Sequence, residues 1–194
     1  MDELETQIEA ELAAITGFLE GRLGRRSRWN GEVELSEDAA VSGRAKWNGR
    51  IAINRRLALT DLRWRTEIHE ALHLLSEGST PQSYLDLQGW EEGAVEQLQR
   101  LLRPSVLNSL NVRVSEALFV SEELTHDYNR FISALETLRG VLNDALLPFY
   151  VKLLATPLSE RPVIIIQAGR QLPLDQFKGF QRAFGLSFST LRGD

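Results

Sequence analysis

The run His69-Glu70-Ala71-Leu72-His73 constrains this chain more than any other feature of its sequence. Two histidines four residues apart lie one turn apart on the same face of an α-helix, where both imidazoles can reach a single ion. Glu70 is turned by about 100° from His69, so its carboxylate is left for proton transfer. The chain has only three histidines and no cysteine, which excludes thiolate ligands and disulfides. The run therefore predicts a helix that carries a metal site.

The residues around this run have the pattern of an amphipathic helix. Thr60 can cap its start, and Gly78 is a stop signal just after Glu77. Apolar side chains share one side, whereas both histidines lie on the other with two polar residues. The apolar set is Trp64, Ile68, Ala71, Leu72 and Leu75, and the opposite set is Arg65, His69, His73 and Ser76. The helix should bury the first face and present the second.

A second helix, from about Gly89 to Arg103, offers the third ligand, and Pro104 should end it. Its apolar stripe contains Leu87, Trp90, Ala94, Leu98 and Leu101, flanked by Val95 and Leu102. Glu91 falls inside that stripe, but Glu92 lies on the polar side. We therefore expect Glu92 to be the ligand. Glu96, one turn further on, can hydrogen-bond a ligating imidazole.

This spacing resembles a known family. Eighteen residues separate His73 from Glu92, and H-E-x-x-H followed by Glu-Gly at that distance resembles the glutamate-type zincin metallopeptidases, or gluzincins. Trp90-Glu91-Glu92-Gly93-Ala94 is similar to the third-ligand stretch of their aminopeptidase branch. Glu96 stands four positions after Glu92, as an acidic residue does in the thermolysin-like branch. The resemblance covers roughly residues 40 to 100, and the single-domain minigluzincins are the closest comparison in size.

The resemblance implies one Zn²⁺ ion bound by His69, His73 and Glu92, with Glu70 as the general base of peptide-bond hydrolysis. It also implies a peptide or protein substrate. The chain has no G-x-M-E-N run, so aminopeptidase specificity does not carry over. The alternative is a catalytically silent zincin-fold protein that serves as a zinc-stabilised interaction or regulatory module, with His126 able to close the fourth coordination position.

A zinc peptidase also needs a hydrogen-bond donor for the developing oxyanion, commonly a tyrosine or histidine. In the carboxy-terminal part, Thr125-His126-Asp127-Tyr128 is the place where both residue types occur together. We expect Tyr128 to be this donor, with His126 as the alternate. For the substrate, an exposed strand of a hairpin centred on Asn48-Gly49 can pair with an extended peptide.

The order of predicted elements indicates an α+β, zincin-like fold: a small twisted sheet, the helix of the histidine motif, the Glu92 helix and a mainly helical carboxy-terminal part. Apolar residues at helical spacing predict a first helix from Leu4 to Leu23. Short strands are expected at Glu32 to Leu35, Val41 to Trp47 and Arg50 to Ile53. Helices are expected at 116–124, 128–141, 143–155, 162–166 and 174–183. We expect a single domain over 1–194, with a sheet-bearing part at 1–103 and a helical part at 104–194.

Composition fits an ordinary globular chain: 194 residues, 43% hydrophobic, 25% charged, with a net charge of -5. No apolar run is long enough for a membrane span, and no secretion signal is seen, so a cytoplasmic location without a membrane partner is expected. The basic cluster Arg22, Arg25, Arg26 and Arg28 fits a helix end better than a phosphate site in a net acidic chain. Nucleic acid is therefore not an expected partner, and the oligomeric state stays open.

Overall fold

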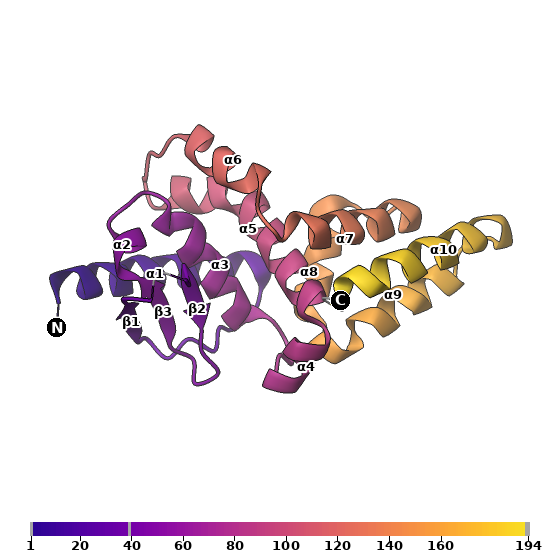
Figure 1. Ribbon diagram of the computed structural model, residues 1–194, viewed down its shortest axis with the longest axis horizontal. Helices are drawn as coiled ribbons and strands as arrows, with labels where there is room; N and C mark the ends of the chain where they lie inside the picture. The colour runs from indigo at the N-terminus through magenta and orange to yellow at the C-terminus, as the bar shows by residue number, and fades with distance from the viewer. Residues whose placement is uncertain (1, 39, 193–194) are drawn as a thin grey trace. The chain divides into compact units, whose positions relative to one another are not determined.

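The computed structural model describes residues 2–38 and 40–192 and shows a mixed α+β chain (Figure 1). This confirms the α+β class predicted from the sequence. The elements in chain order are α1 (Glu3–Leu23), β1 (Val33–Ser36), β2 (Gly43–Ala45), β3 (Ile51–Asn54), α2 (Arg55–Ala58), α3 (Arg63–Leu75), α4 (Pro81–Asp86), α5 (Gln88–Ser109), α6 (Glu116–Leu124), α7 (Asn129–Leu142), α8 (Leu146–Ala155), the 3-10 helix η1 (Leu158–Glu160), α9 (Arg161–Arg170) and α10 (Leu174–Leu191).

The chain folds into two compact units, each built from segments that are separate in the sequence. Among the described residues, unit 1 comprises 2–38, 40–75 and 99–124, and unit 2 comprises 76–98 and 125–192. Helix α5 is continuous and contributes its first half to unit 2 and its second half to unit 1.

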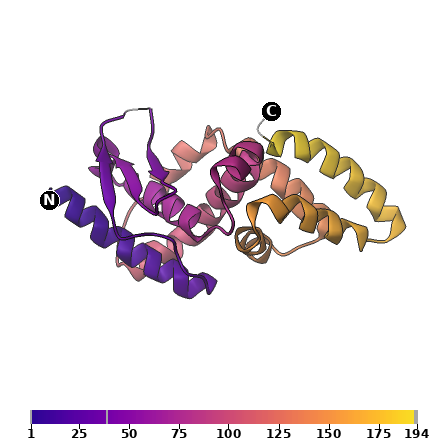
Figure 2. The same ribbon diagram turned by 90° about the horizontal axis from the view of Figure 1, so that it is seen from below.

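The sheet of unit 1 has three strands in the order β1-β3-β2. Strand β3 pairs with β1 in parallel and with β2 in antiparallel fashion. The β2–β3 hairpin turns at Asn48-Gly49, as predicted, and Gly49 has the positive φ of 86° that this turn requires. Helices α1 and α3 contact each other and lie against the sheet, which can be followed in both views (Figures 1 and 2).

Helix α1 forms because capping and periodicity agree. Asp2 caps it by accepting a hydrogen bond from the Leu4 amide, and Gly24 ends it in the left-handed conformation. One apolar stripe along the helix is completely buried, and it consists of Ile8, Leu12, Ile15 and Leu19. Burying four such side chains contributes on the order of 6–12 kcal/mol before conformational entropy is subtracted. Thus α1 supplies a large part of the core on which α3 rests.

In unit 2, helices α7, α9 and α10 contact one another, and α10 packs along α7. A ladder of ring contacts runs along α10, formed by Phe177, Phe180, Phe184 and Phe188. Gly169 of α9 permits the close approach of α10, because a Cβ there would lie 2.1 Å from the ring of Phe180. The carboxy-terminal part is therefore helical, as expected, but α10 runs well past the predicted end at 183.

Pro104 does not end the second motif helix, so that prediction is wrong. Helix α5 continues through Pro104 to Ser109. Val106 and Leu107 extend the buried stripe beyond the proline, with Val106 fully buried. The packing of these side chains offsets the hydrogen bond that proline removes from a helix interior. Residues 104–109 are thus part of α5.

A pair of carboxyl groups, one buried and one half-buried, links α1 and α3 in unit 1. Glu67 is completely buried and faces Glu11, whose carboxylate receives two hydrogen bonds from Arg63 at 2.9 and 3.0 Å. Burial, together with the negative charge of Glu11, raises the pKa of Glu67 well above its ordinary value, although Arg63 counteracts the rise. Glu67 therefore keeps its proton at pH values where an exposed glutamate has lost it.

This shift makes the stability of unit 1 depend on pH. The folded state binds the Glu67 proton more tightly than the unfolded state. The contribution of Glu67 to the free energy of unfolding is therefore fully present below about pH 4.5, the ordinary pKa, and is lost as pH rises towards the folded pKa. Glu67→Gln keeps a donor towards Glu11 and removes the titration. In metal-free protein, urea unfolding from pH 5 to 8 should show a flatter pH profile for this variant, by about 1.4 kcal/mol per unit of pKa shift. Glu122→Gln, at an exposed site, should leave the profile unchanged; parallel wild-type and Glu67→Gln profiles would contradict the assignment.

Candidate metal centre

Helix α3 presents the two histidines of the motif to each other. The Nε2 atoms of His69 and His73 lie 3.1 Å apart, and their ring planes are inclined by 73°. His69 is buried and His73 is half-buried. The opposite side of the helix is held in the core by the predicted apolar set, of which Ile68, Ala71 and Leu72 are completely buried. This packing fixes the direction in which both imidazoles point.

The carboxyl end of α3 is capped by arginines that follow α1. Arg25 donates a hydrogen bond from Nε to the carbonyl oxygen of Leu75 at 3.1 Å, and Arg28 donates from Nη2 to that of His73 at 3.1 Å. The Arg28 amide also donates to the Leu74 carbonyl at 2.9 Å. Positive charge at this end complements the helix dipole. Arg25 and Arg28 thus lie at a helix end, as predicted for the cluster, but they bond to the end of α3 rather than to the end of the first helix.

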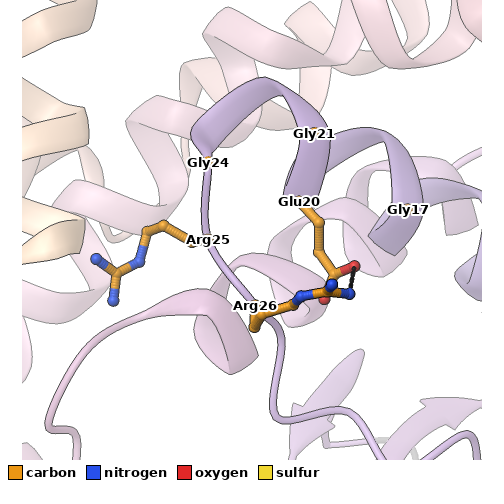
Figure 3. Close-up of a pocket in the computed structure, with 6 residues that line it drawn as sticks. All are labelled: Gly17, Glu20, Gly21, Gly24, Arg25 and Arg26. Atoms are coloured by element: carbon orange, nitrogen blue, oxygen red, sulfur yellow. Dashed lines mark ion pairs between the residues drawn. The ribbon is translucent and has the colours of Figure 1, made fainter.

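A cavity of about 360 Å³ lies beside this cluster and contains none of the motif residues. It is lined by Gly17, Glu20, Gly21, Gly24, Arg25 and Arg26. Figure 3 shows the Arg26 side chain beside Glu20, with Arg25 pointing away from that pair. Arg26 is 94% exposed and its ion pair with Glu20 spans 3.9 Å, a distance at which a surface pair contributes little.

On α5 the two neighbouring glutamates have different partners. Glu91 is buried, forms an ion pair with Arg161 Nη1 at 2.7 Å and accepts a hydrogen bond from Ser76 Oγ at 2.8 Å. Glu92, on the polar side of the helix, is 3% exposed. The polar face of α5 is itself buried, at Glu92, Glu96, Gln99 and Arg103. The charged side chains on this buried face need polar partners, because a buried charged group is stable only when it is paired or binds a metal.

His69, His73 and Glu92 form a group that can hold a metal ion, because one ligand atom from each lies within 4.8 Å of the others. The distance between the two imidazole nitrogens provides a test of fit. Two nitrogens bound to one tetrahedral zinc ion at about 2.0–2.1 Å lie about 3.3 Å apart, close to the observed 3.1 Å. Two imidazoles and a carboxylate are also a donor set that suits Zn²⁺.

Tyr84 is part of this site although the sequence did not single it out. Its hydroxyl donates a hydrogen bond to Oε1 of Glu92. Burial and the charge of Glu92 raise the pKa of Tyr84 far above its ordinary value, so the phenol remains a donor. Tyr84 lies on the short helix α4, which Thr80 and Ser83 begin with a reciprocal capping box and Pro81 in the first turn. That capping pattern was the available signal for α4.

The carboxylate of Glu70 is hydrogen-bonded to the sheet. Its Oε2 accepts a hydrogen bond from the backbone amide of Ala45, on β2, at 2.6 Å. The neighbouring Gly43 lets β2 approach this closely, because a Cβ there would lie 2.4 Å from Thr66 Cγ2 and 3.0 Å from Glu70 Cγ. Glu70 thus lies next to the histidines in sequence but is turned towards β2 and is 6% exposed.

The remaining predicted site residues are Glu96, on α5, and Tyr128, directly before α7. Glu96 is completely buried one turn after Glu92, and its predicted hydrogen bond to a ligating imidazole stays a prediction. Tyr128 lies directly before α7 with its ring 4.8 Å from that of His126. Tyr128 also raises the pKa of Tyr84 by electrostatic interaction. Tyr128 therefore lies near the Tyr84 phenol.

Among the described residues, no helix is both long and apolar enough to cross a membrane. Comparison with known proteins gives no assignment: no family model matches the chain, and neither a curated protein nor a solved structure matches it.

Proposed function

We propose that this protein is a zinc-dependent metallopeptidase of the gluzincin type, with a zincin-like fold. The observation that carries the proposal is the close approach of the ligand atoms of His69, His73 and Glu92, with a glutamate directly after the first histidine. A site that only stabilised a fold would not need Glu70 and would usually close its fourth position with a protein ligand.

A zinc ion bound here would act as a Lewis acid towards a peptide carbonyl and would lower the pKa of water. Glu70 is the proton carrier in the proposed reaction. Its carboxylate takes a proton from the water whose oxygen attacks the carbonyl carbon, and it passes that proton to the amine when the carbon–nitrogen bond breaks. His69 and His73 supply neutral imidazole ligands, while Tyr84 orients the Glu92 carboxylate.

Strand β2 is the proposed docking element for the substrate. In the order β1-β3-β2 it lies at the edge of the described sheet, where an extended peptide can be added by backbone hydrogen bonds. Ala45 of β2 contacts Glu70 directly. A peptide paired with this edge would therefore lie beside the proposed base.

One observation favours the alternative, a zincin-fold module that binds zinc and a partner without cleavage. The carboxylate of Glu70 is engaged with the Ala45 amide rather than left for proton transfer. The two functions are separated by measuring zinc content together with the cleavage of a mixed peptide library. Cleavage that is lost with a chelator and restored by zinc supports the peptidase. One bound zinc, four protein ligands and no cleavage would support the module.

The two tyrosines should respond differently to removal of the hydroxyl. Tyr84→Phe removes the hydrogen bond to Glu92 and should weaken zinc binding by about 10- to 100-fold, as expected for a partner that orients a ligand. Tyr128→Phe should keep zinc affinity and lower turnover by about 10²- to 10³-fold, if Tyr128 stabilises the oxyanion. Zinc affinity is measured by competition with a chelating dye and turnover with the peptide library. Unchanged turnover in Tyr128→Phe would remove that residue from the mechanism, and the same test would then pass to His126.

A further inference from the structure

On the outward edge of β2, the backbone amide of Ala45 already donates a hydrogen bond to a side chain. Ser42 and Lys46 flank β2. Asn54 N of β3 donates to Ser42 O at 2.9 Å, and Lys46 N donates to the carbonyl of Arg50, directly before β3, at 2.8 Å. Bonding directions alternate along an antiparallel strand, so Arg44 faces β3 while Gly43 and Ala45 face the open edge. The Ala45 N–H, a donor that an added strand would need, points instead into the Glu70 carboxylate.

The hydrogen bond between the Ala45 amide and the Glu70 carboxyl group is short. The two atoms are 2.6 Å apart, and the bond joins the buried, ionisable Glu70 carboxyl group to the amide of half-buried Ala45. Hydrogen bonds to an ionised acceptor are roughly twice as strong as neutral ones. Gly43 leaves no space between β2 and α3, since any side chain there would displace Thr66 or Glu70. The strand therefore holds Glu70 in one position.

We propose that the Ala45 amide retains the Glu70 carboxylate until a peptide strand adds to the edge of β2, takes over this amide and releases Glu70. This inference rests on the proposed function, because it treats Glu70 as the base. A single N–H cannot form a full hydrogen bond with both the carboxylate and a peptide carbonyl. Occupation of the edge and retention of Glu70 exclude each other, so the substrate itself frees the group that acts on it. Ala45 is then a positioning residue.

The exchange of partners predicts a graded series of peptide affinities. The full chain without added metal is titrated with N-acetyl-tetra-alanine amide, a peptide that offers backbone groups and little side-chain preference. Affinity should rise from wild type to Glu70→Gln to Glu70→Ala, because the bond that must be broken becomes neutral and then disappears. The two ends of the series should differ by about tenfold, the effect of one hydrogen bond to a charged group.

Nuclear magnetic resonance identifies the amide. In the wild type the Ala45 proton should resonate downfield and exchange slowly, and both properties should be lost in Glu70→Ala. The Arg44 amide, which faces β3, is the internal control and should not move. In wild type, the peptide should change the carboxyl carbon resonance of Glu70 together with the Ala45 amide. Ala45→Pro removes the donor at an edge position where proline is tolerated, and it should bind the peptide weakly whether residue 70 is Glu or Ala.

Three results would overturn the inference: an Ala45 amide that does not respond to Glu70→Ala, equal peptide affinity in wild type and Glu70→Ala, or no peptide-induced shift on β2 in any variant. These measurements use no metal and no cleavage. A chain that binds no zinc can still show the exchange at Ala45, and a zinc peptidase can fail to show it. Failure of the inference is thus distinct from failure of the proposed function.

Discussion

Arg161→Met is expected to destabilise unit 2 by about 3–5 kcal/mol, because it leaves the carboxylate of Glu91 buried without its cation. Both side chains are almost completely buried, and the ion pair measures 2.7 Å. The guanidinium also donates to Ser76 Oγ at 2.6 Å and to the Trp90 carbonyl at 3.0 Å. Loss of Arg161 therefore removes a buried partner from Glu91, Ser76 and the Trp90 carbonyl at the same time. Urea unfolding followed by circular dichroism measures the change.

The double variant Arg161→Met/Glu91→Met separates the pair from the packing. Replacing both charges by apolar groups of similar size should recover most of the loss, since a buried ion pair often contributes little beyond the cost of burying its members. Arg170→Met changes the exposed arginine at the end of the same helix and should alter stability by less than about 0.5 kcal/mol. A loss below about 1 kcal/mol in Arg161→Met, or no recovery in the double variant, would show that Glu91 does not depend on Arg161.

Glu70→Gln is expected to lower peptide turnover by about 10²- to 10⁴-fold, the range for loss of a general base, while one zinc ion stays bound. The amide keeps the size of the carboxylate and an oxygen that can accept from Ala45. It cannot take a proton from water. The reduction should therefore appear in kcat, with the unfolding free energy nearly unchanged. Product formation from the mixed peptide library and metal analysis of the same samples give both quantities.

Glu122→Gln is the matched control, because it makes the same chemical change at an exposed position on α6 and should leave turnover and zinc content unchanged. Retention of at least half of the wild-type turnover in Glu70→Gln would exclude Glu70 as the base. Equal and negligible turnover in both proteins, with zinc bound, would favour the interaction module.

The spacing of apolar residues predicted the helices that bury a single face in the core. The stripe from Ile8 to Leu19 located α1, and the apolar set around Ile68 located α3 with the histidines opposite it. Turn chemistry at Asn48-Gly49 predicted the hairpin correctly. On α5, the separation of Glu91 from Glu92 by helix face corresponds to two different sets of partners.

The features that were missed depend on contacts that local sequence does not contain. Pro104 is a helix-end signal in the sequence, but α5 continues beyond it because Val106 is buried in the core. Short helices such as α4 have no full apolar stripe, so periodicity gave no signal for the segment that places Tyr84. Arg161 meets Glu91 from a position 70 residues away, and nothing in its own neighbourhood distinguishes it from an exposed arginine at a helix start.

We expect His69, His73 and Glu92 to bind one zinc ion, and zinc stoichiometry combined with X-ray absorption at the zinc edge tests this most directly. One zinc per chain is expected, with nitrogen and oxygen ligands at about 2.0–2.2 Å, and this zinc should be lost in His69→Ala, His73→Ala and Glu92→Ala. Folded Glu91→Ala should retain the metal. A wild-type protein that takes up no zinc, or one that keeps its zinc after loss of either histidine, would rule out this site.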